Sequence, residues 1–185
     1  MMDKANQKEI VTSRLKLRFC REEDAPTIKH LCNNFNLYKS TLTLPFPYTV
    51  EDATFWMKSH QENFEQDKRY EFVITDLEIG TLYGAIALTP NKQHAHGELA
   101  YWIGEPYWGK GIGTEAAQAM VEFAFHEKQL HKVFARFLKS NPASGRIMEK
   151  IGMKQEGVLR EHVSKEDRFE DLVQYGVLNS RKLSL

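Results

Sequence analysis

YWGKGIGTEAA, residues 107–117, places three glycines and a lysine directly before a helical pattern. Glycine has no Cβ, so a ligand can approach its backbone closely. The free N–H groups at the start of a helix favour an anion. The stretch therefore predicts a phosphate-binding loop, although an ordinary strand-to-helix turn can also use such glycines.

Two well-known phosphate loops nearly match this stretch. Gly104, Gly109 and Lys110 fit the P-loop pattern G-x-x-x-x-G-K, but Gly111 stands where that loop needs Ser or Thr to hold magnesium. Gly109 and Gly111 also fit the dinucleotide fingerprint, but Thr114 stands where its third glycine belongs. Each match lacks a residue that its chemistry requires.

The chain as a whole has the composition of a single soluble domain, which we expect to span residues 1–185. Apolar residues make up 42% and charged residues 27% of the 185 residues. Lys plus Arg equals Asp plus Glu at 25 each, so no overall field favours nucleic acid or an anionic membrane. The chain shows no signal-peptide or membrane-length apolar run, and Cys20 and Cys32 fit no metal or redox spacing. We expect a cytoplasmic protein without nucleic-acid or membrane partners.

Hydrophobic periodicity predicts an α/β sandwich, a mixed sheet with helices packed on it. Thr49 and Asp52 have the spacing of a capping box, and residues 38–50 contain two prolines among aromatics, which predicts a loop. Strands are predicted over 12–20, 70–76, 81–89, 96–104, 131–139, 160–164 and 171–178. Helices are predicted over 25–34, 51–64 and 114–130, with a turn and short helix over 140–152.

Several ordered motifs resemble the GCN5-related N-acetyltransferase (GNAT) superfamily, and more closely its RimJ/RimL-type branch. The superfamily signature Q/R-x-x-G-x-G/A is met by Gly111 and Gly113, with Trp108 at the first position, as is common in the RimL-like branch. The resemblance implies a GNAT fold, with a mixed, mostly antiparallel sheet of about six to seven strands flanked by helices. The other matching motifs are TSRLKLR, EEDA, PFPYTVEDATFW, GELAYWIG, SNPASGRIMEKIGM and a final EGVLR…D…Y.

The resemblance implies that the loop binds the pyrophosphate of acetyl-CoA. Backbone N–H groups of residues 109–114 would hold it, Lys110 would add positive charge, and no metal would be required. The cofactor-binding residues expected on this basis are Trp102, Ile103, Gly109, Lys110, Gly111, Ile112, Gly113, Thr114, Asn141 and Arg146.

Two residues are candidates for catalysis. Glu98 matches a position where several family members carry a general-base glutamate. Strand alternation places it on one face with Ala100 and Trp102, and the alternative is that it meets water or pairs with a base. For the leaving thiolate, Met148 stands where many members have a tyrosine acid, and Ser144 matches a serine near the thiol in RimL-like members. Asn141 and Ser144 can alternatively cap the short helix.

The resemblance implies an N-acetyltransferase, and the RimL-like motifs point to a protein N-terminal α-amine as acceptor. An α-amine has a pKa of about 8 and needs less help from a base than lysine does. Acetylation of a small amine, such as a polyamine, an antibiotic or an amino-acid derivative, stays open as an alternative. So do a non-catalytic acyl-CoA-binding module and, more remotely, a P-loop nucleotide-binding protein. A homodimer is equally open.

Overall fold

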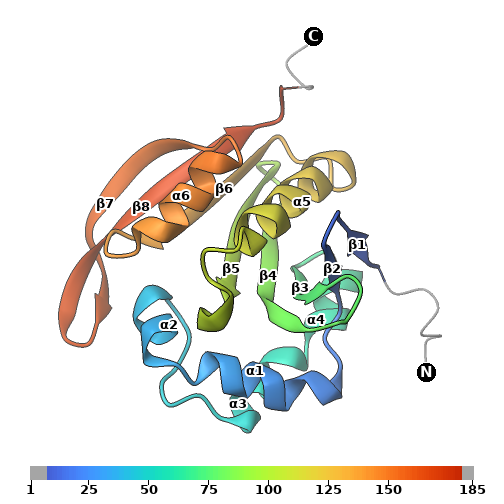
Figure 1. Cartoon of the computed structure of the whole chain (residues 1–185). Coiled ribbons are helices and arrows are strands. Elements are labelled where there is room, and N and C mark those ends of the chain that lie inside the picture. The colour runs from blue at the N-terminus through green and yellow to red at the C-terminus, as the bar shows by residue number, and fades with distance from the viewer. Residues whose placement is uncertain (1–7, 181–185) are drawn as a thin grey trace.

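One sheet of eight strands organises the chain (Figure 1). The computed structural model describes residues 8–180. The strands follow the order β1-β2-β3-β4-β5-β6-β8-β7, and every neighbouring pair is antiparallel except β5 and β6. Their bounds are β1 (Ile10–Val11), β2 (Leu15–Arg18), β3 (Tyr70–Asp76), β4 (Leu82–Asn91), β5 (His96–Ile103), β6 (Lys132–Leu138), β7 (Lys154–Lys165) and β8 (Arg168–Leu178).

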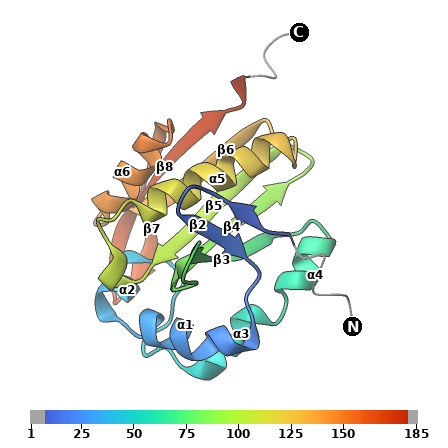
Figure 2. The same cartoon turned by 45° about the vertical axis from the view of Figure 1, so that its right-hand side comes forward.

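Helices pack on both faces of the sheet (Figures 1 and 2). Alternation along β3 directs Phe72 and Ile74 into the core cluster under α5 and α6, and directs Val73 into a second cluster with α1 and α3. The helices are α1 (Ala25–Cys32), α2 (Phe35–Ser40), α3 (Val50–Met57), α4 (His60–Glu65), α5 (Ile112–His126) and α6 (Pro142–Lys150), with short 3-10 helices η2 (Glu22–Asp24) and η3 (Glu105–Tyr107).

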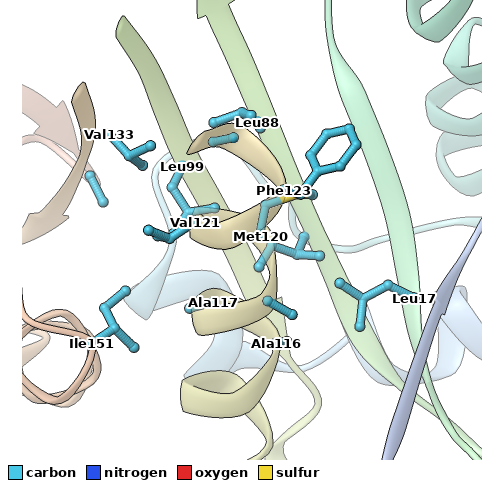
Figure 3. Packing of buried hydrophobic residues seen from close by; sticks show 14 of the residues in the cluster. Leu17, Leu88, Leu99, Ala116, Ala117, Met120, Val121, Phe123, Val133 and Ile151 are labelled. Atoms are coloured by element: carbon cyan, nitrogen blue, oxygen red, sulfur yellow. The ribbon is translucent and has the colours of Figure 1, made fainter. Parts of the chain in front are cut away.

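The main core lies between α5 and the sheet (Figure 3). The apolar stripe predicted for this helix, Ala117, Met120, Val121 and Ala124, is buried as expected. Leu99 of β5 is buried in the same cluster. The helix that follows the glycine loop is therefore held on the sheet by a continuous apolar face, which fixes the position of its first turn.

The α/β fold with a mostly antiparallel sheet confirms the predicted class, and the differences lie in exposed elements. The sheet has eight strands instead of six to seven because the two-residue β1 is too short to show a pattern. Strand β7 begins at Lys154 instead of residue 160 because most of its side chains are exposed and do not alternate. The predicted single domain covers 1–185, of which 1–7 and 181–185 lie outside the described residues.

Two helical predictions also needed correction. The loop predicted for 38–50 begins inside α2, whose N-cap Asn34 accepts a hydrogen bond from the Leu37 N–H. Leu37 alone is buried in this short helix, so it leaves no periodic signal. The helix predicted over 51–64 is divided into α3 and α4, although the Thr49–Asp52 capping box is present as predicted. Within residues 8–180, no helix is both long and apolar enough to cross a membrane.

The two parallel strands at the centre of the sheet separate partway along their length. Residues 96–99 of β5 pair with 132–135 of β6, and the pairing ends at Leu99 and Ala135. Strand β5 nevertheless continues to Ile103 and β6 to Leu138. Beyond Leu99, the edge of β5 that faces β6 therefore has no strand partner within residues 8–180, and apart from the Ile103 carbonyl, which accepts from Trp108 Nε1, its backbone polar groups can meet other partners.

Candidate active site

A cavity of about 800 Å³ lies beside the unpaired end of β5, a volume in the range of small-molecule sites. Five segments surround it: α2, the end of β5, the glycine loop with the start of α5, the start of α6, and the turn between β7 and β8. Its lining includes Lys39, Ser40, Thr41, Tyr101, Trp102, Ile103, Gly109, Gly111, Ile112, Gly113, Thr114, Ser140, Asn141, Ser144, Arg146, Lys150, Lys165, Glu166, Arg168 and Glu170.

The glycine loop has the conformation that its sequence requires. Gly109 and Gly111 have φ values of +74° and +80°, which side chains rarely adopt. A Cβ at Gly109 would meet no atom within 4 Å, so this backbone is open. Gly111 is the N-cap of the fifteen-residue α5 and has no side chain to accept from the first-turn N–H groups. The predicted anion-binding backbone therefore lines the cavity.

A hydrogen-bonded anchor behind the loop was not predicted. Glu115 in the first turn of α5 accepts from Thr12 Oγ1, Ser13 Oγ, and both the backbone N–H and Nε of Arg14 at 2.6–3.0 Å. Arg14 also donates through Nη1 to the Lys110 carbonyl at 3.3 Å. The turn between β1 and β2 thus fixes the loop from outside the cavity.

Lys110 itself does not line the cavity. Its ammonium lies 5.5 Å from the centroid of the Tyr107 ring, which is a cation–π contact. The adjoining Trp108 donates its indole N–H to the Ile103 carbonyl at 2.6 Å and so ties the loop to the end of β5. A contribution of Lys110 to phosphate binding therefore stays a prediction. It would require the Lys110 side chain to rotate from the Tyr107 ring toward the cavity.

Asn141 and Ser144 lie together at the start of α6. The Asn141 amide donates to the Ser40 carbonyl at 2.9 Å and to Ser144 Oγ at 3.3 Å. Asn141 is the N-cap by position, but its side chain makes no capping hydrogen bond. The amide therefore connects α6 to α2 inside the cavity instead of capping the helix.

Tyr101 is a residue of the cavity that the sequence analysis missed. Its hydroxyl donates to the Ser144 carbonyl at 3.3 Å, and burial raises the pKa of the phenol to about 12. Met148, at the position of the family's tyrosine, is 2% exposed and belongs to the core. The phenol that hydrogen-bonds to the predicted leaving-group serine thus comes from β5, on the same face of that strand as Leu99.

Glu98 lies apart from the residues that surround the cavity. Both of its carboxylate oxygens accept from Arg136, from Nε and Nη2, at 2.8 Å each. The two side chains are about one-third exposed, at 32% and 31%. The ion pair expected as the alternative to a catalytic role of Glu98 is therefore present. The role of Glu98 as a general base stays a prediction.

The charges in the cavity are unequal. Five basic side chains contribute to its lining and two acidic ones, Glu166 and Glu170. Glu170 accepts from Ser140 Oγ at 2.5 Å, so this carboxylate adjoins the turn before α6. Residues 8–180 contain no group of three or more His, Cys, Asp or Glu placed to hold a metal. The basic side chains are Lys39, Arg146, Lys150, Lys165 and Arg168.

Comparison with known proteins places this geometry in a family. Residues 14–154 match the acetyltransferase (GNAT) domain. Two relatives from Bacillus subtilis are the probable N-acetyltransferase YjcK, 34% identical over 71% of this chain and 74% of its own, and the uncharacterized N-acetyltransferase YnaD, 31% identical over 91% and 96%. The structure of RimL, the ribosomal L7/L12 α-N-protein acetyltransferase in complex with coenzyme A, has the same fold, with a TM-score of 0.84, 16% identity, and coverage of 92% and 98%. The chain thus belongs to the GNAT family of N-acetyltransferases.

Proposed function

We propose that the protein transfers the acetyl group of acetyl-CoA to the α-amine of a protein N-terminus. The observation that carries this proposal is the cavity, which brings together the glycine loop, the unpaired end of β5 and the Asn141–Ser144 turn. All the predicted site residues except Glu98 and Lys110 contribute to its lining.

The described residues fit acetyl-CoA in chemistry. The N–H groups at the start of α5 would hold the pyrophosphate, beside an open Gly109 backbone. The unpaired edge of β5 beyond Leu99 would hydrogen-bond the amides of the pantetheine arm, as a sheet edge does with an added strand. Arg146 and Lys150 would supply positive charge. When bound, acetyl-CoA supplies a thioester carbonyl that an amine can attack.

Departure of the thiolate requires a hydrogen-bond donor, and Ser144 is the side chain we assign to it. Ser144 Oγ accepts from the Asn141 amide, so its own hydroxyl hydrogen stays available for donation. The Tyr101 hydroxyl donates to the Ser144 carbonyl and holds the serine in place across the cavity. We therefore treat Ser144 as the catalytic donor and Tyr101 as a positioning residue.

The acceptor amine must lose a proton before it can attack, and this requirement favours an α-amine over a lysine amine. The candidate base Glu98 is ion-paired with Arg136 and is not among the described residues that line the cavity. It would therefore give the acceptor amine little help in losing its proton. An α-amine, with a pKa of about 8, is partly neutral near neutral pH, whereas a lysine amine at about 10.4 is not. A polyamine is disfavoured further because the lining has more basic than acidic side chains.

Release of free thiol from acetyl-CoA tests the function against a panel of acceptors. We expect turnover with peptides that have a free N-terminus, none with the same peptides blocked at the N-terminus, and a kcat/KM for spermidine lower by about tenfold or more. Faster turnover of spermidine would replace the N-terminal acceptor with a small amine. Binding of acetyl-CoA without turnover of any acceptor would favour the non-catalytic module.

A further inference from the structure

Lys165 contributes to the lining of the cavity, and its ammonium group is bound by another part of the same chain. It donates to the carbonyl oxygens of Tyr38 and Thr41, at the end of α2, and lies 4.1 Å from the centroid of the Tyr38 ring. The carboxylates of Glu166 and Glu170 act on it electrostatically. Two carbonyls, an aromatic face and nearby carboxylates are the groups that recognise a primary ammonium ion.

The position of Lys165 is set by a tight hairpin. Lys165 pairs with Arg168 across a two-residue turn, Glu166 and Asp167, which have φ values of +49° and +58°. Positive φ at both residues is the pattern of a type I′ turn, which matches the twist of the flanking strands. The hairpin tip lies on the side of α2 in Figure 1, and the hydrogen bonds of Lys165 join the two. The lysine is thus presented to the cavity by a defined turn.

The site that binds the Lys165 ammonium adjoins the start of α6, where Asn141 and Ser144 lie. Between Tyr38 and Thr41, the Ser40 carbonyl accepts from Asn141, whose amide also donates to Ser144. One short segment of backbone therefore binds the ammonium on one side and the residues of α6 on the other. An amine held by this segment would lie next to the end of the cavity that we assign to the thioester.

We propose that the carbonyls of Tyr38 and Thr41, together with the Tyr38 ring, form the subsite for the ammonium group of the acceptor, and that Lys165 occupies it as an internal competitor. This inference rests on the proposed function and defines the acceptor as a primary ammonium. An incoming amine would displace Lys165 and take over its hydrogen bonds. The competitor is tethered, so its effective concentration is high and the acceptor's apparent affinity is reduced.

The surroundings of Lys165 also suit an amine that must lose a proton. Burial lowers the pKa of Lys165, while Glu166 and Glu170 raise it, and the net direction is downward. An acceptor amine bound in the same place would experience the same burial. Its neutral, nucleophilic form would be more accessible there than in water.

Binding of a small primary amine tests the subsite without any turnover. We would titrate n-butylammonium chloride into the wild-type protein and into Lys165→Met, which keeps the length of the side chain but removes its charge. We expect Lys165→Met to bind the probe at least about tenfold more tightly, and Lys165→Arg to remain like the wild type. The matched control is Lys154→Met, an exposed lysine at the other end of β7.

Kinetics supply the second readout. With an N-terminal peptide as acceptor, Lys165→Met should lower KM by about tenfold, and Lys154→Met should leave it unchanged. No gain in n-butylammonium affinity in a Lys165→Met protein that melts like the wild type would overturn the inference and leave Lys165 as a structural tie. Should Lys165→Met fail to fold, Lys165→Gln carries the same comparison. A failure of turnover alone would contradict the proposed function, while the binding measurement would still decide the subsite.

Discussion

Asn141 donates its side-chain amide to the carbonyl oxygen of Ser40 at 2.9 Å, across 101 residues of sequence. This hydrogen bond joins the first turn of α6 to the end of α2, which are neighbouring walls of the cavity. The wall assigned to the cofactor and the wall assigned to the acceptor are therefore held as one unit. Changes at either wall should be felt at the other.

Asn141→Asp tests this connection with almost no change in shape. A carboxylate cannot donate to the Ser40 carbonyl, and it places negative charge beside an acceptor oxygen. We expect kcat/KM to fall by about tenfold or more, which corresponds to the loss of a part-buried hydrogen bond. The matched control is Asn91→Asp, where the side-chain oxygen accepts from the His94 N–H and an aspartate can do the same. Equal activity of the two variants would contradict the connection.

Ser144→Ala should affect turnover more than cofactor affinity. Removal of the proposed donor to the leaving thiolate should lower kcat by about 10²-fold, the smaller end of acid–base effects. The dissociation constant of acetyl-CoA, measured by calorimetry, should change by less than about twofold. Equal losses in both quantities would reduce Ser144 to a structural residue of α6.

Glu98→Gln separates a base from an ion pair. Because Arg136 holds both carboxylate oxygens and the pair is about one-third exposed, we expect the unfolding free energy to fall by less than about 1 kcal/mol. We also expect the pH profile of kcat/KM, recorded between about pH 6 and pH 9, to keep its shape. A rate loss that becomes steeper at low pH would instead establish Glu98 as the general base.

His60 should make the protein sensitive to acid. Burial lowers its pKa to about 4, from an ordinary 6.5, and Cys20 Sγ lies 2.8 Å from its Nδ1. The unfolded chain therefore binds more protons than the folded protein between these values, so stability is complete above about pH 6.5 and is lost as the pH falls toward 4. Denaturant unfolding should show a loss of about 2 kcal/mol between about pH 7.5 and pH 5 from this residue.

His60→Gln isolates this effect from its neighbour Glu71. The Glu71 carboxylate lies 3.4 Å from His60 Nε2, and burial raises its pKa, so its contribution to stability has the opposite sign: it is present at low pH and lost as the pH rises. The variant should lose most of the pH dependence assigned to His60. An unchanged slope of stability against pH would show that His60 is not buried as a neutral ring.

Local patterns in the sequence predicted the α/β fold and the glycine loop, and the resemblance to the GNAT superfamily named ten residues that line the cavity. The glycines before α5 and the alternation along β5 depend on neighbouring residues, and both were correct in position. The partners of Glu98 and Tyr101 depend on tertiary pairing. Arg136 lies on the face of Glu98 only because Glu98 aligns with Phe134 in the parallel register, which no local pattern encodes. Such long-range contacts require the structure.

The sequence also could not reveal the bounds of the exposed elements. Strand β7 and helix α2 bury few side chains, so their apolar periodicity is weak. Lys165, which comes from β7 and contacts α2, was therefore not recognised as part of the site. Charged residues on such elements look like ordinary surface until their partners are known.

Calorimetric titration of acetyl-CoA into Gly109→Ala and Gly80→Ala tests most directly whether the glycine loop holds the cofactor. Both glycines have positive φ, +74° and +73°, and a Cβ at either would meet no atom within 4 Å. Each substitution should therefore cost a similar backbone strain of about 1 kcal/mol, but only Gly109 lines the cavity. We predict that Gly109→Ala weakens acetyl-CoA binding by about tenfold or more, because a Cβ would keep the pyrophosphate from the backbone, and that Gly80→Ala binds like the wild type. Equal affinity of the two variants would contradict the account.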